Sequence, residues 1–151
     1  MGAIKKWSKE TVRDITSLGG FAIYWLVIFL FLAMMQWNLV LRLLFAFGIT
    51  VAVAYVIRLF YYRDRPKKES YKSHLEKMDA SSFPSLHTLR SAAFAVVLIP
   101  FFNNLLVSIL LITYAILVGF TRIGLKKHHF SDVLFGWIVG FLIGYLTIVL
   151  I

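Results

Sequence analysis

Residues 88–120 read TLRSAAFAVVLIPFFNNLLVSILLITYAILVGF, and they carry the clearest signal of the fold. Two apolar runs, Thr88 to Phe102 and Asn104 to Phe120, are separated only by Pro100 and the pair Asn103, Asn104. Asparagine and proline are typical of turns. The stretch therefore predicts a tight helical hairpin, each arm of which approaches the roughly 20 apolar residues that cross a bilayer.

Three further apolar segments flank this hairpin: Phe21 to Trp37, Leu39 to Phe60 and Val133 to Ile151. The chain of 151 residues is 60% hydrophobic and only 15% charged, with a mean hydropathy of +0.82, which lies outside the range of soluble domains. We therefore predict an all-α, integral membrane helical bundle of about five transmembrane helices, forming a single domain over residues 1–151.

Residues 1–20 have the pattern of an amphipathic helix lying in the membrane interface. Apolar side chains such as Trp7, Ile15 and Leu18 recur at helical spacing opposite lysines and Arg13. Gly19 and the glycine after it are expected to end this arm. A signal peptide is the alternative for the first apolar segment, which is long and lacks a cleavage pattern.

The formal charge of +9 lies almost entirely on one face of the predicted bundle. With five spans, the arm and both polar loops fall on that face, together with every basic residue except Arg42 and all seven acidic residues. In so apolar a chain, this charge favours anionic headgroups or phosphate ligands over nucleic acid. Either the face is cytoplasmic by the positive-inside rule, or its charge is partly functional; both interpretations stay open.

Two polar segments, 61–87 and 120–132, are the predicted active-site loops, and the first of three polar clusters lies at the start of the longer one. In RLFYYRDRP, Arg58 ends a span and Arg65 precedes a proline. The planar guanidinium suits phosphate oxygens. For Arg58 alone, the alternative is that its side chain only extends toward the lipid headgroups and has no role in binding phosphate.

The second cluster is FPSLH, residues 83–87. Serines and Pro84 are typical of a helix start, where unsatisfied N–H groups attract anions, so Ser85 and His87 would lie beside an anion site. The alternative is that the serines only cap the helix and that His87 is an interface residue.

The third cluster is TRIGLKKHHFSD, residues 121–132. His128 and Asp132 are four residues apart and can share a helix face, so that the carboxylate accepts the ring N–H and fixes the tautomer. The alternative is that Asp132 only caps the last helix. Together the clusters offer arginines, two histidines and a carboxylate for phosphoryl transfer. Clustered hard carboxylates are lacking, so we predict no metal and no cofactor.

The ordered pattern Arg58-x6-Arg65-Pro66, Pro84-Ser85-x-His87 and Thr121-Arg122-x5-His128-x3-Asp132 resembles the type 2 phosphatidic acid phosphatase (PAP2) superfamily of membrane lipid phosphatases. That family reads K-x6-R-P, P-S-G-H and S-R-x5-H-x3-D. Leu86 replaces the glycine of the second motif, and the chain has five predicted spans where many relatives have six.

The resemblance implies a role for each matched residue. His128 would be the nucleophile that forms a phosphohistidine, Asp132 would orient it, and His87 would serve as general acid and base. Phosphate ligands would be Arg58, Arg65, Ser85, Thr121 and Arg122. The adjacent His129 does not match the nucleophile position.

From these patterns we predict a metal-independent phosphatase of the cell (plasma) membrane, with its site near one face, acting on a polyprenyl diphosphate, phosphatidylglycerol phosphate or phosphatidic acid. Its partners would be the lipid phosphate and the bilayer, with no nucleic acid. A catalytically impaired relative that binds lipid headgroups as a membrane scaffold is the alternative, because Leu86 stands where backbone usually approaches phosphate. A transporter is disfavoured, since it would need polar groups deep within the spans.

Overall fold

The computed structural model describes residues 12, 14–17, 19–67 and 73–151, and every regular element in this part of the chain is a helix. The helices are α2 (Phe21–Ala33), α3 (Trp37–Phe60), α4 (His74–Ala80), α5 (Leu86–Phe102), α6 (Leu105–Gly124) and α7 (Phe130–Leu150). The prediction of an all-helical bundle is confirmed. Most of the predicted interfacial arm, residues 1–20, lies outside the described residues; of it, residues 12 and 14–17 are helical.

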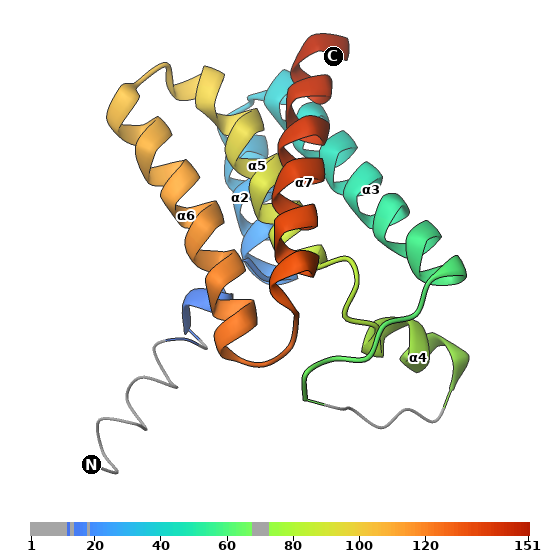
Figure 1. The fold of residues 1–151 in the computed structure, drawn as a ribbon. Helices are drawn as coiled ribbons and strands as arrows, with labels where there is room; N and C mark the ends of the chain where they lie inside the picture. Colours follow the sequence, from blue (N-terminus) through green and yellow to red (C-terminus); the bar gives the residue numbers. More distant parts are fainter. Residues whose placement is uncertain (1–11, 13, 18, 68–72) are drawn as a thin grey trace, which may run out of the picture.

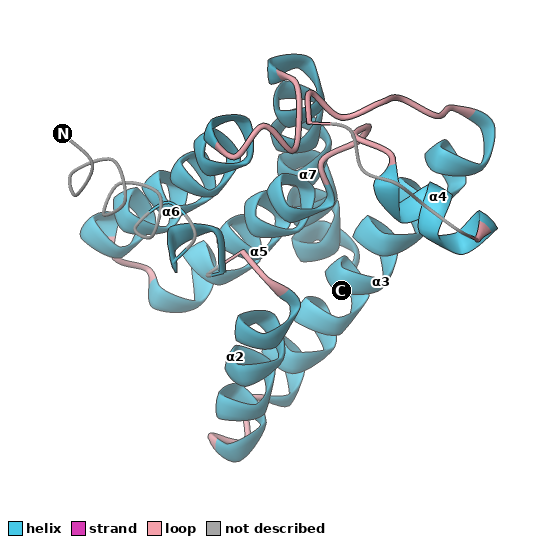
Figure 2. Ribbon diagram, turned by 90° about the horizontal axis from the view of Figure 1, so that it is seen from below, coloured by secondary structure: helices cyan, strands magenta, loops and turns pink. Residues whose placement is uncertain are grey.

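Helix α5 occupies the middle of the bundle. It packs against α3, α6 and α7, while α2 packs on α3 (Figures 1 and 2). The contact with α7 is very close, because a Cβ atom on Gly140 would lie only 2.4 Å from the Leu89 carbonyl oxygen. Small residues allow helix backbones to approach in this way within membranes. This contact fixes the start of α7 beside the start of α5, where the second and third polar clusters meet.

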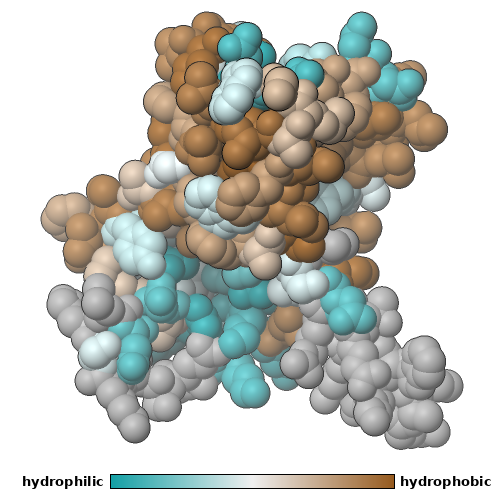
Figure 3. Space-filling view, turned by 180° about the vertical axis from the view of Figure 1, so that it is seen from behind, coloured by the Kyte–Doolittle hydropathy of each residue, from teal (hydrophilic) through white to brown (hydrophobic). Residues whose placement is uncertain are grey.

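The surface of the bundle is that of a membrane protein. Helices α3, α6 and α7, of 24, 20 and 21 residues, are the three in the described part of the chain that are long and apolar enough to cross a bilayer, and α2 and α5 are shorter apolar helices. Large apolar side chains such as Phe60, Leu105 and Leu150 are exposed. Figure 3 shows apolar residues over one part of the molecule and hydrophilic residues gathered toward the other end. The chain is an integral membrane protein.

The helix boundaries depart from the predicted spans at the polar end. Helix α5 begins at Leu86, α6 continues to Gly124 and α7 begins at Phe130, so parts of both predicted active-site loops are helical. The reason is that the polar motif residues serve as ends of the spanning helices, which hydropathy alone does not detect. The short helix α4, with Ser73 as its N-cap, was also not predicted.

The predicted hairpin turn is present, with one difference. Asn103 adopts a left-handed conformation, with φ of 43° and ψ of 42°, directly after α5. Asn104 then caps α6, since its side chain accepts a hydrogen bond of 3.1 Å from the Val107 N–H. Pro100 lies inside α5 instead of ending it. The turn is therefore set by the asparagines, and the proline is accommodated within the last turn of the helix.

Candidate active site

The ends of four helices bring the predicted residues to one end of the bundle. Arg58 lies in the last turn of α3 and Arg122 in the last turn of α6, while His87 is in the first turn of α5. His128 precedes α7, and Asp132 lies in its first turn. The arginines at 58 and 122 are each only 7% exposed, His128 is 3% exposed and Asp132 is fully buried. Charged groups as deeply buried as Arg58 and Asp132 require partners, which the contacts below provide.

The two arginines of the first cluster, Arg58 and Arg65, both contact Asp79 in α4. Arg58 donates a hydrogen bond of 3.1 Å from Nη2 to the Pro84 carbonyl, and its Nη1 lies 3.8 Å from the Asp79 carboxylate. Arg65 donates from Nη2 to the main-chain carbonyl of Asp79. The Nε of Arg58 is buried and has no hydrogen-bond partner among the described residues.

The serine-rich segment before α5 contributes main-chain and side-chain donors. Ser85 is the N-cap of α5, and its Oγ lies 2.8 Å from the Thr88 hydroxyl instead of capping the helix. Ser82 donates its N–H to the Arg63 carbonyl at 2.8 Å, and its buried hydroxyl has no partner among the described residues. Leu86, which replaces the motif glycine, is the first residue of α5 and is partly buried.

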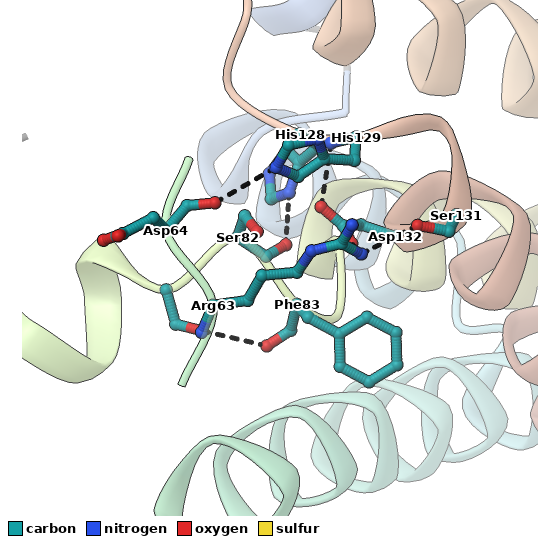
Figure 4. Close-up of polar contacts among 9 residues, drawn as sticks. Arg63, Asp64, Ser82, Phe83, His128, His129, Ser131 and Asp132 are labelled. Carbon is teal, nitrogen blue, oxygen red and sulfur yellow. Dashed lines mark hydrogen bonds and ion pairs between the residues drawn. The ribbon is translucent and has the colours of Figure 1, made fainter. Parts of the chain in front are cut away.

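His128 is held by backbone groups on both sides. Its N–H lies 3.3 Å from the Arg122 carbonyl, and its ring Nδ1 lies 2.5 Å from the Ser82 carbonyl (Figure 4). A carbonyl oxygen only accepts hydrogen bonds, so this contact requires a proton on Nδ1 and leaves Nε2 with a lone pair. Burial, reinforced by the positive charge of Arg122, lowers the pKa of His128 to about 2. The imidazole is therefore neutral at physiological pH.

The predicted hydrogen bond from His128 to Asp132 is not formed. The Asp132 carboxylate instead pairs with Arg63, whose Nη1 lies 2.6 Å from Oδ1, and accepts the His129 N–H at 2.8 Å (Figure 4). Asp132 thus caps α7, which was the alternative considered for it. The physical reason is that Asp132 is the third residue of α7 whereas His128 precedes that helix, so the two side chains do not share one helical face.

The hydroxyl of Thr121 is engaged within the helical bundle. It donates to the Val118 carbonyl at 2.7 Å and accepts from the Thr16 hydroxyl at 2.6 Å. A role as phosphate ligand would require this hydroxyl to turn away from the Val118 carbonyl. Its neighbour Arg122 is buried at the same helix end and contributes its charge beside His128.

Sequence reasoning missed two residues that the structure places at the site. Arg63 joins the first polar segment to the third, and Ser82 provides the carbonyl that contacts His128. The signal for Arg63 was the buried acid at 132, which needs a cation, but the sequence offers several arginines for that purpose. A carbonyl acceptor has no signature in the sequence, because every residue carries one.

No group of three or more His, Cys, Asp or Glu that could hold a metal ion occurs among the described residues. The arrangement is a neutral buried imidazole with Nε2 unprotonated, surrounded by arginine side chains and unpartnered donors. Chemically, it can bind a phosphate dianion and attack its phosphorus atom.

Comparison with known proteins identifies the family of this chain. The family model described as the PAP2 superfamily matches residues 39–151. Undecaprenyl-diphosphatase BcrC of Bacillus subtilis (strain 168) is 30% identical over 97 residues, which are 64% of this chain and 49% of that protein. The chain thus spans about half the length of this relative.

Two solved structures share the fold, each with a TM-score of 0.79. The first is a transmembrane PAP2 type phosphatidylglycerolphosphate phosphatase from Bacillus subtilis, 29% identical, with 95% of this chain and 76% of that chain covered. The second is Aquifex aeolicus LpxE, 22% identical, with 94% and 86% covered; at this identity the likeness concerns the fold alone. Because the family model covers most of the chain, including all three motifs, the chain belongs to the PAP2 superfamily.

Proposed function

We propose that this protein is a metal-independent phosphatase that removes phosphate from a membrane lipid phosphate or diphosphate through a phosphohistidine at His128. The observation that carries the proposal is the state of that residue. Its Nδ1 contacts the Ser82 carbonyl, and the depressed pKa keeps the ring neutral, so Nε2 is a nucleophile at physiological pH. Family membership supports the same reaction class.

The basic groups at the site would stabilise the charge of the transferring phosphoryl group. Arg58, Arg65 and Arg122 all lower the pKa of His128 through their positive charge, so they lie close enough to act on a phosphate bound beside its ring. Preorganised cationic donors of this kind replace the role that a metal has in other phosphatases. The unpartnered Arg58 Nε and Ser82 hydroxyl would each donate to a phosphate oxygen.

The reaction would proceed in two balanced steps. Burial and the positive charge of Arg122 lower the pKa of His87 to about 3, so its imidazole would take up a proton as the phosphate dianion binds and offsets the arginine charges. In the first step, His128 Nε2 forms a bond to phosphorus while the bond to the leaving oxygen breaks, and the protonated His87 donates that proton to the leaving oxygen. In the second, His87 accepts a proton from water, the water oxygen attacks phosphorus, and the bond to His128 breaks to release inorganic phosphate. Asp132 would contribute only indirectly, by holding the chain around His128 in place, since its carboxylate contacts Arg63 and the His129 N–H.

The substrate would be a lipid whose apolar tail stays in the bilayer while its phosphate reaches the polar end of the bundle. Exposed apolar side chains surround the helices (Figure 3), and the buried Arg58 and Arg122 lie in the last turns of α3 and α6, at the polar end. The similar proteins carry names for an undecaprenyl diphosphate and a phosphatidylglycerol phosphate substrate. We favour a polyprenyl diphosphate, because this chain has little loop with which to recognise a headgroup. The cell (plasma) membrane is the proposed location.

The test is phosphate release by the purified protein in detergent, with EDTA present, from polyprenyl diphosphate, phosphatidylglycerol phosphate and phosphatidic acid. Wild type is compared with His128→Ala and with His129→Ala, a matched histidine whose Nε2 lies 3.2 Å from the Asp64 carbonyl. We expect release that persists in EDTA, is lost in His128→Ala and is retained in His129→Ala, with polyprenyl diphosphate preferred.

Absence of release from every lipid by folded wild-type protein would contradict the proposal. Retained binding of the lipid phosphates in that case would favour the headgroup-binding scaffold, with Leu86 as the residue responsible. Restoring the motif glycine by Leu86→Gly would then be expected to recover turnover.

A further inference from the structure

Arg63 contacts the segment before α5 and the start of α7, although it lies outside the three motifs. Its side chain donates from Nη1 to the Ser131 hydroxyl at 2.7 Å and to the Asp132 carboxylate at 2.6 Å. Its main chain accepts the Ser82 N–H at 2.8 Å and donates to the Ser81 hydroxyl at 3.4 Å. One residue thus bridges the segment after α3, the segment before α5 and the start of α7 (Figure 4).

These contacts lie on both sides of His128. On one side, the Arg63 carbonyl holds Ser82, whose own carbonyl accepts the proton of His128 Nδ1. On the other side, the Arg63 guanidinium holds Asp132, which caps α7 through the His129 N–H, one residue after the histidine. The carboxylate is fully buried, so its ion pair with the one-third-exposed arginine side chain is shielded from water on the acid's side.

We infer that Arg63 is a positioning residue that fixes the His128 imidazole for attack, and that the orienting acceptor of this imidazole is the Ser82 carbonyl and not the Asp132 carboxylate. Asp132 contributes to this positioning as the ion-pair partner of Arg63. This inference rests on the proposed function for its kinetic consequences, but the contacts that it assigns to His128 are open to measurement without turnover.

The kinetic test compares Arg63→Met, Arg63→Lys and Asp132→Asn with wild type. A displacement of the nucleophile by about 1 Å costs on the order of 100-fold in rate, so we expect Arg63→Met to lower kcat by about that factor. KM for the lipid and the inhibition constant of inorganic phosphate should change little, because the phosphate-binding arginines remain. Arg63→Lys should recover part of the loss, since an ammonium group still pairs with the carboxylate.

Lys67→Met is the matched control, since it removes a cation from the same segment. The Lys67 side chain is exposed, and its main-chain N–H, which donates to the Lys126 carbonyl at 3.0 Å, is retained in the variant. Its kcat should stay within about twofold of wild type, as is usual for surface substitutions. The double variant Arg63→Met with Asp132→Asn should be no slower than the slower single variant, because the two residues act as one unit. Additive losses, or an Arg63→Met kcat within about twofold of wild type, would overturn the inference.

A nitrogen-15 NMR spectrum of histidine-labelled protein tests the acceptor directly, and His128→Asn identifies the signal. We expect the neutral tautomer with the proton on Nδ1 in wild type, and the same tautomer in Asp132→Asn because Ser82 holds it. A switch of the proton to Nε2 in Asp132→Asn would show that the carboxylate is the acceptor and overturn the inference. This spectrum is informative even if wild type releases no phosphate, so failure of the proposed function and failure of this inference remain distinguishable.

Discussion

The two ends of the helical bundle are built from different kinds of interaction. At the end where α5 turns into α6, Phe31 packs against Phe101 and Phe102, with ring centroids 5.1 and 6.4 Å apart. At the site end, the fully buried Asp132 and Ser85 are held by an ion pair and hydrogen bonds. Apolar packing depends little on direction, whereas hydrogen bonds require defined geometry. We infer that the polar end determines the catalytic chemistry, whereas the apolar part of the bundle mainly determines the stability of the fold.

The largest expected effect distinguishes two arginines of the same helix. Arg58 lies at the site end of α3 and Arg42 near its other end. Removal of a charged donor that stabilises a transition state costs about 100- to 1,000-fold in rate, so Arg58→Met should lower kcat/KM for a lipid diphosphate by about 100-fold. Arg42→Met should leave kcat/KM nearly unchanged. Equal losses of kcat/KM for the two variants in steady-state phosphate-release assays would show that the two ends of the bundle do not differ in their importance for catalysis.

A second prediction concerns the close contact between α5 and α7. In Gly140→Ala, the new Cβ would lie 2.4 Å from the Leu89 carbonyl oxygen, which is backbone and cannot move aside cheaply. Overpacking of this kind costs about 1 to 3 kcal/mol. Gly48→Ala is the matched control, because nothing lies within 4 Å of the position of its Cβ. Thermal unfolding in detergent should show a lower midpoint for Gly140→Ala alone; an unchanged midpoint would mean that the two helices are not in contact as described.

A third prediction is a pH dependence of stability that originates at the site end. The folded protein holds His128 neutral, with its pKa lowered to about 2 from an ordinary value of 6.5, whereas the unfolded chain binds a proton below pH 6.5. The folded state therefore binds fewer protons, and the contribution of His128 to stability falls as pH decreases below 6.5, by at most about 1.4 kcal/mol per pH unit. Unfolding midpoints of wild type between pH 7 and pH 5 should fall more steeply than those of His128→Asn. Parallel curves for the two proteins would contradict a buried neutral imidazole.

The smallest expected effect is at the far turn. Asn103 has a φ of 43°, a conformation that asparagine tolerates and that costs alanine about 1 to 2 kcal/mol. Asn103→Ala should therefore lower stability by about 1 kcal/mol while kcat stays at the wild-type value. Loss of turnover without loss of stability would show that the two ends are coupled more strongly than their contacts indicate.

Much of the fold was predictable from the sequence, because long apolar runs have few alternatives to spanning helices. The five apolar segments and the turn at Asn103 were found in this way. The exact ends of α5, α6 and α7 were not, since their last turns carry polar residues that hydropathy assigns to loops. The close packing of α5 on α7 was also missed, although glycines 136, 140 and 144 are spaced by four residues along one helix face.

The motif residues at the polar end of the bundle could be predicted from the sequence, but Arg63 and the contacts among these residues could not. The motifs identified the histidines, the arginines and Asp132 from their order and spacing. The partner of Asp132 could not be derived, because the separation of four residues from His128 presumes one continuous helix, whereas α7 begins only at Phe130. Which of several arginines reaches a buried acid depends on tertiary structure, and so does the main-chain carbonyl that holds His128.

The most direct test of the central claim is to trap the phosphorylated enzyme. Wild type, His128→Ala and His129→Ala would be mixed with a lipid diphosphate that carries a radioactive terminal phosphate and quenched with alkali within milliseconds, since phosphohistidine survives alkali and is hydrolysed by acid. We expect label on the peptide that contains His128 in wild type and in His129→Ala, and none in His128→Ala. Continued phosphate release without label on the wild-type protein, or label that persists in His128→Ala, would contradict that claim.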